Sequence, residues 1–227
     1  MTALAIADDA LIAAQRLLAW VSRAPTMEED VALANIALDQ LGVARALLSS
    51  LGDEDELAFH REAHEFRNCL LVELPDDPGG SVWGDFGVLT AKLLFLAAYQ
   101  KMLYDRLADS EPGALGAVAA KARKESAYHL DHATQWTLRL GDGTAESHGR
   151  MQDAVDALWP YTHELTGLIE RADWLAIVEP VLAKATLARP ADGWQPTGGR
   201  VGRHTEHLSY LLAEMQSTHR AHPGATW

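Results

Sequence analysis

The stretch ALDQLGVAR, Ala37 to Arg45, places a glutamine and a glycine inside a run that otherwise has the pattern of a buried helix. Apolar side chains recur around it at helical spacing, and the face that they define also carries the glutamine. That face comprises Leu33, Ile36, Ala37, Gln40, Val43, Ala44 and Leu47. A carboxamide in a core costs free energy unless it finds a hydrogen-bond partner. We therefore expect Gln40 to be a polar residue that is satisfied inside a helix bundle.

Helical periodicity continues over almost the whole chain, and no convincing run of strict alternation marks a strand. Thr26 and Glu29 have the spacing of a capping box, which predicts a helix start. Pro160 and Pro180 are expected to break or kink the later helices. The expected helices cover about Leu4–Ser22, Thr26–Leu51, Glu56–Leu74, Asp85–Ala108, Ala114–Leu140, Ser147–Leu158, Asp173–Leu187 and Thr205–Ala221.

Four of these helices are long, and the charged segment Glu56–Leu74 would join the second to the third. A helix bundle with one long crossover has the ferritin-like topology. An α-solenoid is the alternative, but no repeat of fixed period occurs. We therefore expect one all-α, ferritin-like domain over residues 1–227, with a core bundle at about 4–140 and a C-terminal helical extension at about 144–227.

Composition narrows the class of protein. The 227 residues carry a formal net charge of −13, which argues against a nucleic-acid binder because such a protein needs a basic face. Asp8 and Asp9 interrupt the first apolar stretch, which therefore lacks the pattern of a secretory signal, and no long uncharged run predicts a membrane span. The single cysteine, Cys69, excludes an internal disulfide and favours the cytoplasm.

A ferritin-like di-iron bundle uses Glu-x-x-His pairs, whose two side chains share one helix face. The candidate slots in this chain hold Gln40 and Val43 on one helix, and Ser126 and His129 on another. Gly42, within the first slot, fits the close approach of a second helix. One imidazole and neutral side chains do not hold two irons. The pattern therefore indicates a helix bundle without a complete metal site.

Other chemistry-bearing groups are weaker candidates. The histidine pair in HREAH departs from the zincin pattern because its glutamate does not follow the first histidine. A metal could bind at RHTEHL, but the start of a surface helix explains this pattern better. The apolar neighbours of Cys69 predict an inert thiol. The basic loop GGRVGR follows no strand, so it does not predict a phosphate loop. The residues concerned are His60, His64, Cys69, His204, Glu206 and His207.

Four longer stretches resemble the family of structural C subunits of bacterial phenylacetyl-CoA ring epoxidases, which are multicomponent oxygenases of phenylacetate breakdown. The similarity runs from about Ala5 to Trp227, and its most specific part is the tail. The stretches are ALANIALDQLGVARALLS at 32–49, LAFHREAHEFRNCLLVELP at 57–75, AKARKESAYHLDHATQWTLRLGDGT at 120–144 and TGGRVGRHTEHLSYLLAEMQSTHRAHPGATW at 197–227.

This resemblance implies a ferritin-like fold and a homologous partner, the catalytic A subunit, which holds the di-iron centre. The A subunit has Glu-Leu-Gly-His where this chain has Gln40 to Val43, and Glu-x-x-His where this chain has Ser126 to His129. The resemblance thus implies degenerate ligand positions, no cofactor in this chain, and a non-catalytic structural role in a heteromer. A large apolar interface with the A subunit is expected, and contacts with other subunits or a homodimer are compatible with it.

Arg200, Arg203 and His204 lie in the basic loop, which we expect to be mobile, and they are candidates for contact with a partner or with the phosphates of CoA. A solvated loop without a role is the alternative. Two other functions stay open: a metal-dependent oxidase with a non-standard site around Glu125, His129 and Asp39, or a helical interaction protein outside any oxygenase.

Overall fold

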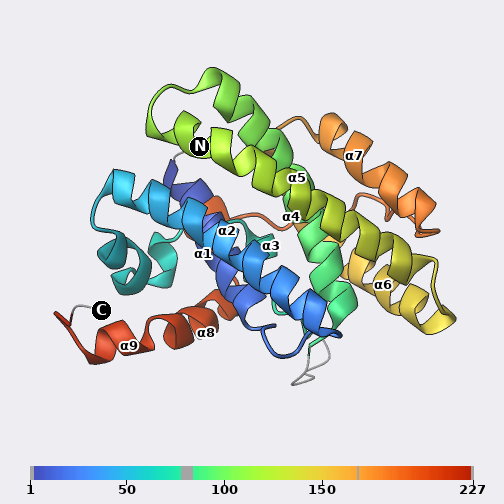
Figure 1. The fold of residues 1–227 in the computed structure, drawn as a ribbon, viewed down its shortest axis with the longest axis horizontal. Helices are drawn as coiled ribbons and strands as arrows, with labels where there is room; N and C mark the ends of the chain where they lie inside the picture. The colour runs from blue at the N-terminus through green and yellow to red at the C-terminus, as the bar shows by residue number, and fades with distance from the viewer. Residues whose placement is uncertain (1–2, 78–83, 168, 226–227) are drawn as a thin grey trace. The chain divides into compact units, whose positions relative to one another are not determined.

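The chain is all-α, and the predicted ferritin-like fold class is confirmed. The computed structural model describes residues 3–77, 84–167 and 169–225, and within these ranges no strand occurs. Contacts divide the chain into two compact units (Figure 1): Met1–Pro75 together with Thr197–Trp227, and Asp76–Pro196. Each unit contains one pair of long helices, the two pairs that a ferritin-like topology requires.

The first unit is built on α1 (Ala3–Leu18) and α2 (Met27–Leu51), which pack against each other along their length (Figure 1). The short link between them makes the pair antiparallel. Thr26 caps α2, because its side chain accepts a hydrogen bond from the backbone N–H of Glu29 at 3.2 Å, as the capping pattern predicts. Residues 5–14 of α1 are buried without interruption, so this helix is enclosed on all sides.

The second unit is built on α4 (Phe86–Ser110) and α5 (Ala114–Gly141), joined by a tight link in which Gly113 has a φ of 81°. Such a left-handed conformation favours glycine. α6 (Ala145–Leu158) and α7 (Arg171–Lys184) pack on this pair. Residues 87–100 of α4 are buried in one run, which makes α4 the central helix of its unit.

The predicted long helices, and the two shorter ones that correspond to α6 and α7, agree with the observed helices to within a few residues. Pro160 lies in the 3-10 helix η3 (Trp159–His163) that directly follows α6, whereas Pro180 lies inside α7 without ending it. The predicted final helix is two helices, α8 (Glu206–Met215) and α9 (Ser217–Ala221). They separate at Gln216, whose buried amide donates hydrogen bonds to two carbonyl groups of the crossover segment.

The prediction of an amphipathic helix over Glu56–Leu74 is wrong. This crossover contains the π-helical turn η1 (Glu56–His60), the 3-10 turn η2 (Ala63–Glu65) and the short helix α3 (Leu70–Glu73), with extended backbone between them. Backbone N–H groups that a helix would use internally go instead to carboxylates of α1: Arg67 N donates to Asp8 and Cys69 N donates to Asp9. These distant acceptors compete with helix formation.

Contacts assign the two parts of the C-terminal extension to different units. Its first part, through residue 196, belongs to the unit of α4 and α5, whereas residues 197–227 belong to the unit of α1 and α2. The last segment of the chain therefore completes the unit that the first segment begins.

Among the residues that the structure describes, two helices are long and apolar enough to cross a membrane by length and composition. They differ in burial: 83% of the apolar window of α4 is buried, as in the core helix of a folded domain, against 44% of that of α2. The unusual helix is thus α2, which is strongly apolar and yet largely uncovered.

Candidate functional site

Gln40 and Val43 lie on the inner face of α2, as predicted. Both are buried, and the whole predicted apolar face of this helix is buried with them. Gln40 is 3% exposed and has an interaction partner. It is therefore a polar residue of the interior, as expected of a buried carboxamide.

Ser126 and His129 occupy the corresponding inner face of α5, where both are buried. The hydroxyl of Ser126 donates to the backbone carbonyl of Arg123 in the preceding turn at 3.2 Å. Glu125 is half-buried and pairs with Lys121 at 3.5 Å, one turn earlier on the outer side of α5. This glutamate is thus engaged on its own helix surface.

The side chains at the four candidate ligand positions do not fit a di-iron centre. They supply one imidazole, one carboxamide, one hydroxyl and one isopropyl group, whereas iron pairs in such bundles are held by several carboxylates and imidazoles. Over residues 3–77, 84–167 and 169–225, no group of three histidine, cysteine, aspartate or glutamate side chains is arranged to hold a metal ion.

Arg200 is bound inside the first unit. Its guanidinium group donates to both carboxylate oxygens of Asp9, at 2.8 and 2.7 Å, and to the backbone carbonyl of Arg67 at 3.0 Å. Asp9 is almost fully buried in α1. A bidentate arginine–carboxylate pair of this kind is strong and geometrically specific. The Arg200 side chain thus fastens the C-terminal segment to α1.

His204 has an acceptor at each ring nitrogen. Nδ1 lies 2.7 Å from Oε2 of Glu73, and Nε2 lies 3.1 Å from the backbone carbonyl oxygen of Phe66. The carboxylate of Glu73 also accepts hydrogen bonds from the backbone N–H of Thr205 at 2.6 Å and from the amide of Asn68 at 2.9 Å. A carboxylate and a backbone carbonyl both accept hydrogen bonds. His204 is thus held between the side chain of Glu73 and the backbone of the crossover.

A further buried pair completes this charge network. Arg61 donates through two guanidinium nitrogens to the carboxylate of Asp8, which is fully buried. Burial raises the pKa of Asp8, and the hydrogen bond and charge of Arg61 act in the opposite direction. We call the set of Asp8, Asp9, Arg61, Glu73, Arg200 and His204 the buried charge network. It joins α1, the crossover and the C-terminal segment within one unit.

The loop GGRVGR is packed against the crossover, so the prediction of a mobile, solvated loop does not fit its contacts. A Cβ atom at Gly199 would lie 2.1 Å from the backbone oxygen of Asn68. Gly202 has a φ of 78°, and a Cβ there would lie 2.1 Å from the backbone oxygen of His64. Only glycine permits these approaches. Of the three predicted contact residues of this loop, Arg203 alone is exposed.

The remaining candidates of the first unit are not brought into one site. His60 and His64 are both exposed. The ring of Phe59 stacks on that of His219 at a centroid distance of 3.9 Å, which fastens α9 to η1. Cys69 is fully buried, as predicted for an inert thiol.

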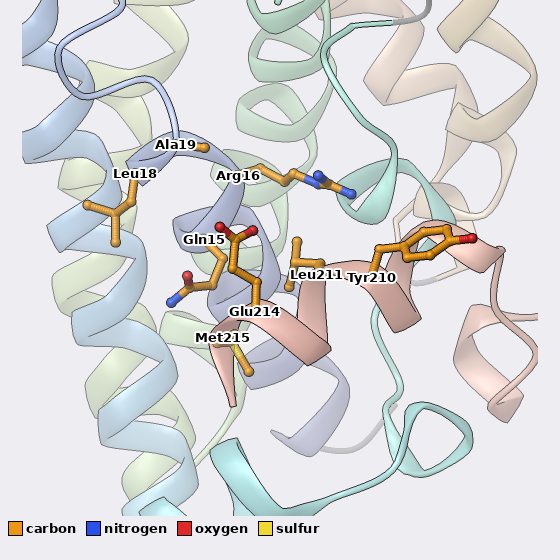
Figure 2. A pocket seen from close by; sticks show the side chains of 8 residues that line it. All are labelled: Gln15, Arg16, Leu18, Ala19, Tyr210, Leu211, Glu214 and Met215. Atoms are coloured by element: carbon orange, nitrogen blue, oxygen red, sulfur yellow. The ribbon is translucent and has the colours of Figure 1, made fainter. Parts of the chain in front are cut away.

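A groove of about 480 Å³ runs between α1 and α8 in the first unit (Figure 2). It is lined by Gln15, Arg16, Leu18, Ala19, Tyr210, Leu211, Glu214 and Met215. In Figure 2 the guanidinium group of Arg16 extends away from Glu214, and it donates to the backbone carbonyl of Glu73. None of the predicted ligand positions lines this groove.

The second unit contains a smaller polar cluster centred on Asp192. Its carboxylate accepts hydrogen bonds from the indole of Trp159 at 3.0 Å and from Arg189 at 2.7 Å. Burial alone would raise the pKa of Asp192, but these donors and the charge of Arg171 lower it well below its ordinary value. Burial and the charge of Arg171 together lower the pKa of His163 nearby. The cluster holds the loop after α7 against η3.

Sequence reasoning missed the buried charge network, although part of its signal was visible. Asp8 and Asp9 interrupt an apolar helix, and two adjacent acids cannot both point away from the core of a helix that is buried on all sides. Their partners could not be found by spacing, because Arg200 lies 191 residues from Asp9. Buried charges require partners, but local pattern does not say which residues supply them.

The comparisons with known proteins cover the chain from end to end. A family model described as "Phenylacetic acid catabolic protein" matches residues 1–170 and 170–227. The chain belongs to this family. It is 41% identical to the C subunit of 1,2-phenylacetyl-CoA epoxidase from Escherichia coli (strain K12). The alignment is 247 positions long and covers 99% of this chain and 97% of that relative. The resemblance noted from the sequence is thereby confirmed.

Proposed function

We propose that this chain is the structural subunit of a multicomponent oxygenase that converts phenylacetyl-CoA into its ring epoxide in phenylacetate catabolism. Its role is to bind and support the catalytic A subunit, which carries the di-iron centre. The support is mechanical: a rigid helical body packs on the partner and fixes the helices that bear the metal ligands. This chain binds no cofactor in the proposal, and it acts in the cytoplasm, where its lone buried cysteine stays reduced.

The observation that carries the proposal is a family match along the full chain combined with unsuitable donors at the ligand positions. The relative is named as the C subunit of an epoxidase. The four positions at which the resemblance places metal ligands are filled here by Gln40, Val43, Ser126 and His129. A protein that keeps the fold and lacks the ligands is suited to support and not to oxygen chemistry.

No observation favours the alternative of an independent metal oxidase. Its proposed ligands included Glu125 and Asp39, but Glu125 pairs with a lysine of its own helix. Asp39 is half-exposed and lies about 100° around α2 from the buried Gln40.

Co-purification tests the proposal directly. The chain and the A subunit from the same organism are expressed separately, mixed, and passed over a size-exclusion column. We expect one co-eluting heteromer, and the run of the isolated chain shows whether it is a monomer or a homodimer. Separate elution at micromolar concentrations of both proteins would contradict the proposed role.

Replacing Gln40 by leucine is expected to leave epoxidase turnover in the reconstituted complex within about twofold of wild type. The reason is that a polar core residue takes no part in the chemistry of the partner. Turnover is measured as oxygen and phenylacetyl-CoA consumption with equal amounts of assembled complex. Gln135→Leu, which removes an exposed amide from α5, is the matched control. A loss of turnover of a hundredfold with intact assembly would place Gln40 in the reaction.

A further inference from the structure

Helix α2 exposes large apolar side chains on the side opposite the one it buries, between the polar residues Asn35, Arg45 and Ser49. At 100° per residue, the buried residues centre on Gln40, and three large exposed apolar side chains lie on the other side of the helix. Met27 is 81% exposed, Val31 57% and Leu38 58%. Soluble helices ordinarily place polar residues on the side that faces solvent. We call this surface, with the adjacent Gly42, the outer face of α2.

Gly42 has no structural reason within this chain. It lies in the middle of a 25-residue helix, is exposed, and has no left-handed conformation. A Cβ atom added there would meet nothing within 4 Å. Glycine inside a helix is destabilising relative to alanine, so its presence usually has a packing reason. The close approach to another helix that its sequence context suggested is not made inside this chain.

Burial in the core of this chain does not account for the apolar character of α2. The apolar window of α2 has a mean hydropathy of 1.4, against 1.2 for α4. α4 buries 83% of that window and α2 only 44%. The more apolar helix is thus the less covered one, which is typical of a surface that meets another protein.

We propose that the outer face of α2 is the surface on which a helix of the catalytic A subunit packs, with its backbone approaching most closely at Gly42. The inference rests on the proposed function and deepens it by naming the face. With a rise of 1.5 Å per residue, α2 offers a contact about 38 Å long. The apolar side chains supply the contact area, and the glycine lets the helix axes come close.

The charge around the outer face argues against a second copy of this chain as the occupant. Acidic side chains border the outer face: Glu28 and Asp30 lie in the first turn and Asp39 near the middle. Arg45, on the same face, pairs with Glu54 at 3.0 Å. A second copy of this chain would bring the same acidic border and a net charge of −13 against it. The A-subunit helix is therefore expected to be apolar in its centre, with lysine or arginine on its flanks.

Leu38→Glu tests the face. The dissociation constant for the A subunit is measured by biolayer interferometry, with thermal melting as a check of folding. The variant is expected to fold as wild type, because the side chain is exposed, and to bind at least about tenfold more weakly, as for a central interface residue. Leu51→Glu is the matched control, since Leu51 is 49% exposed on the same helix but points about 140° away from Leu38. It is expected to bind within about twofold of wild type.

Substitutions at Gly42 are expected to affect the stability of the isolated chain and the binding of the A subunit in different ways. Gly42→Ala is expected to raise the melting temperature of the isolated chain by about 1–3 °C, because alanine favours the helix. Gly42→Leu also leaves the isolated chain folded, because the space over it is open, but it should weaken A-subunit binding at least about tenfold. A merely structural glycine would show no such separation of stability from binding.

The outcomes separate this inference from the proposed function. If wild type binds the A subunit and both Leu38→Glu and Gly42→Leu bind as tightly, the face is wrong while the structural role stands. Loss of self-association without loss of A-subunit binding would assign the face to a second copy and overturn the inference. If wild type binds no A subunit, both proposals fall.

Discussion

Replacing Arg200 by leucine is expected to lower the free energy of unfolding by about 2–4 kcal/mol, because the buried carboxylate of Asp9 then has no counter-charge. The Arg200 side chain is 20% exposed and that of Asp9 only 2%, so solvent replaces little of what the guanidinium group supplies. Chemical denaturation of the isolated chain, followed by circular dichroism, measures the change.

Arg45→Leu is the control, because Arg45 is 74% exposed in its pair with Glu54 and should change stability by less than about 1 kcal/mol. The double variant Asp9→Asn, Arg200→Leu should recover part of the loss, since no unpaired charge remains. An Arg200→Leu protein of wild-type stability that binds the A subunit poorly would instead show that Arg200 is a partner contact, as first expected from the sequence.

Replacing Glu73 by leucine is expected to destabilise the first unit by about 3–5 kcal/mol, the largest effect of any single change considered. Glu73 is fully buried, and three N–H donors converge on its carboxylate, from Asn68, His204 and the backbone of Thr205. Leucine leaves all three without this acceptor. The C-terminal segment should therefore lose its hold on the crossover.

Hydrogen–deuterium exchange distinguishes this local loss from general unfolding. In the Glu73→Leu variant, amides of residues 198–215 are expected to exchange faster than those of α4 and α5. Glu214→Leu, an exposed change on α8, should leave the exchange pattern and stability unchanged to within about 0.5 kcal/mol. Uniformly faster exchange across both units, or none, would contradict a local role of the Glu73 carboxylate.

The long helices were predictable because their signals are local. The apolar spacing of α2, α4 and α5 repeats over six or more turns, and Thr26 marks the start of α2 by a side-chain contact only three residues away. The absence of ligands at Gln40 and Val43 was likewise readable, because it depends on residue identity and on one helix face.

The crossover and the C-terminal loop were not predictable by the same means. Their conformations depend on carboxylates of α1, which accept hydrogen bonds from the backbone N–H groups of Arg67 and Cys69. They also depend on Gly199 and Gly202, which have no side chain and therefore approach the crossover backbone closely. These contacts join segments that are 59 to 138 residues apart. The charge-rich crossover was thus predicted to be an amphipathic helix, although several of its polar groups form hydrogen bonds with buried residues of α1.

The buried charge network gives the supporting role a physical basis. Three carboxylates, two arginines and one histidine hold α1, the crossover and the last segment in one arrangement. α2 packs on α1 within the same unit, so its outer face is carried by a body whose parts are fixed by directional contacts. Such preorganisation lowers the entropic cost of binding a partner.

Iron content is the most direct measure of the central claim that this chain supports a metal enzyme without holding the metal. The chain alone and its complex with the A subunit are purified after growth in iron-rich medium and analysed by inductively coupled plasma mass spectrometry. The account predicts no stoichiometric iron in the isolated chain and about two irons per pair of subunits in the complex, a content that His129→Ala leaves unchanged. Stoichiometric iron in the isolated chain that disappears in His129→Ala would contradict it.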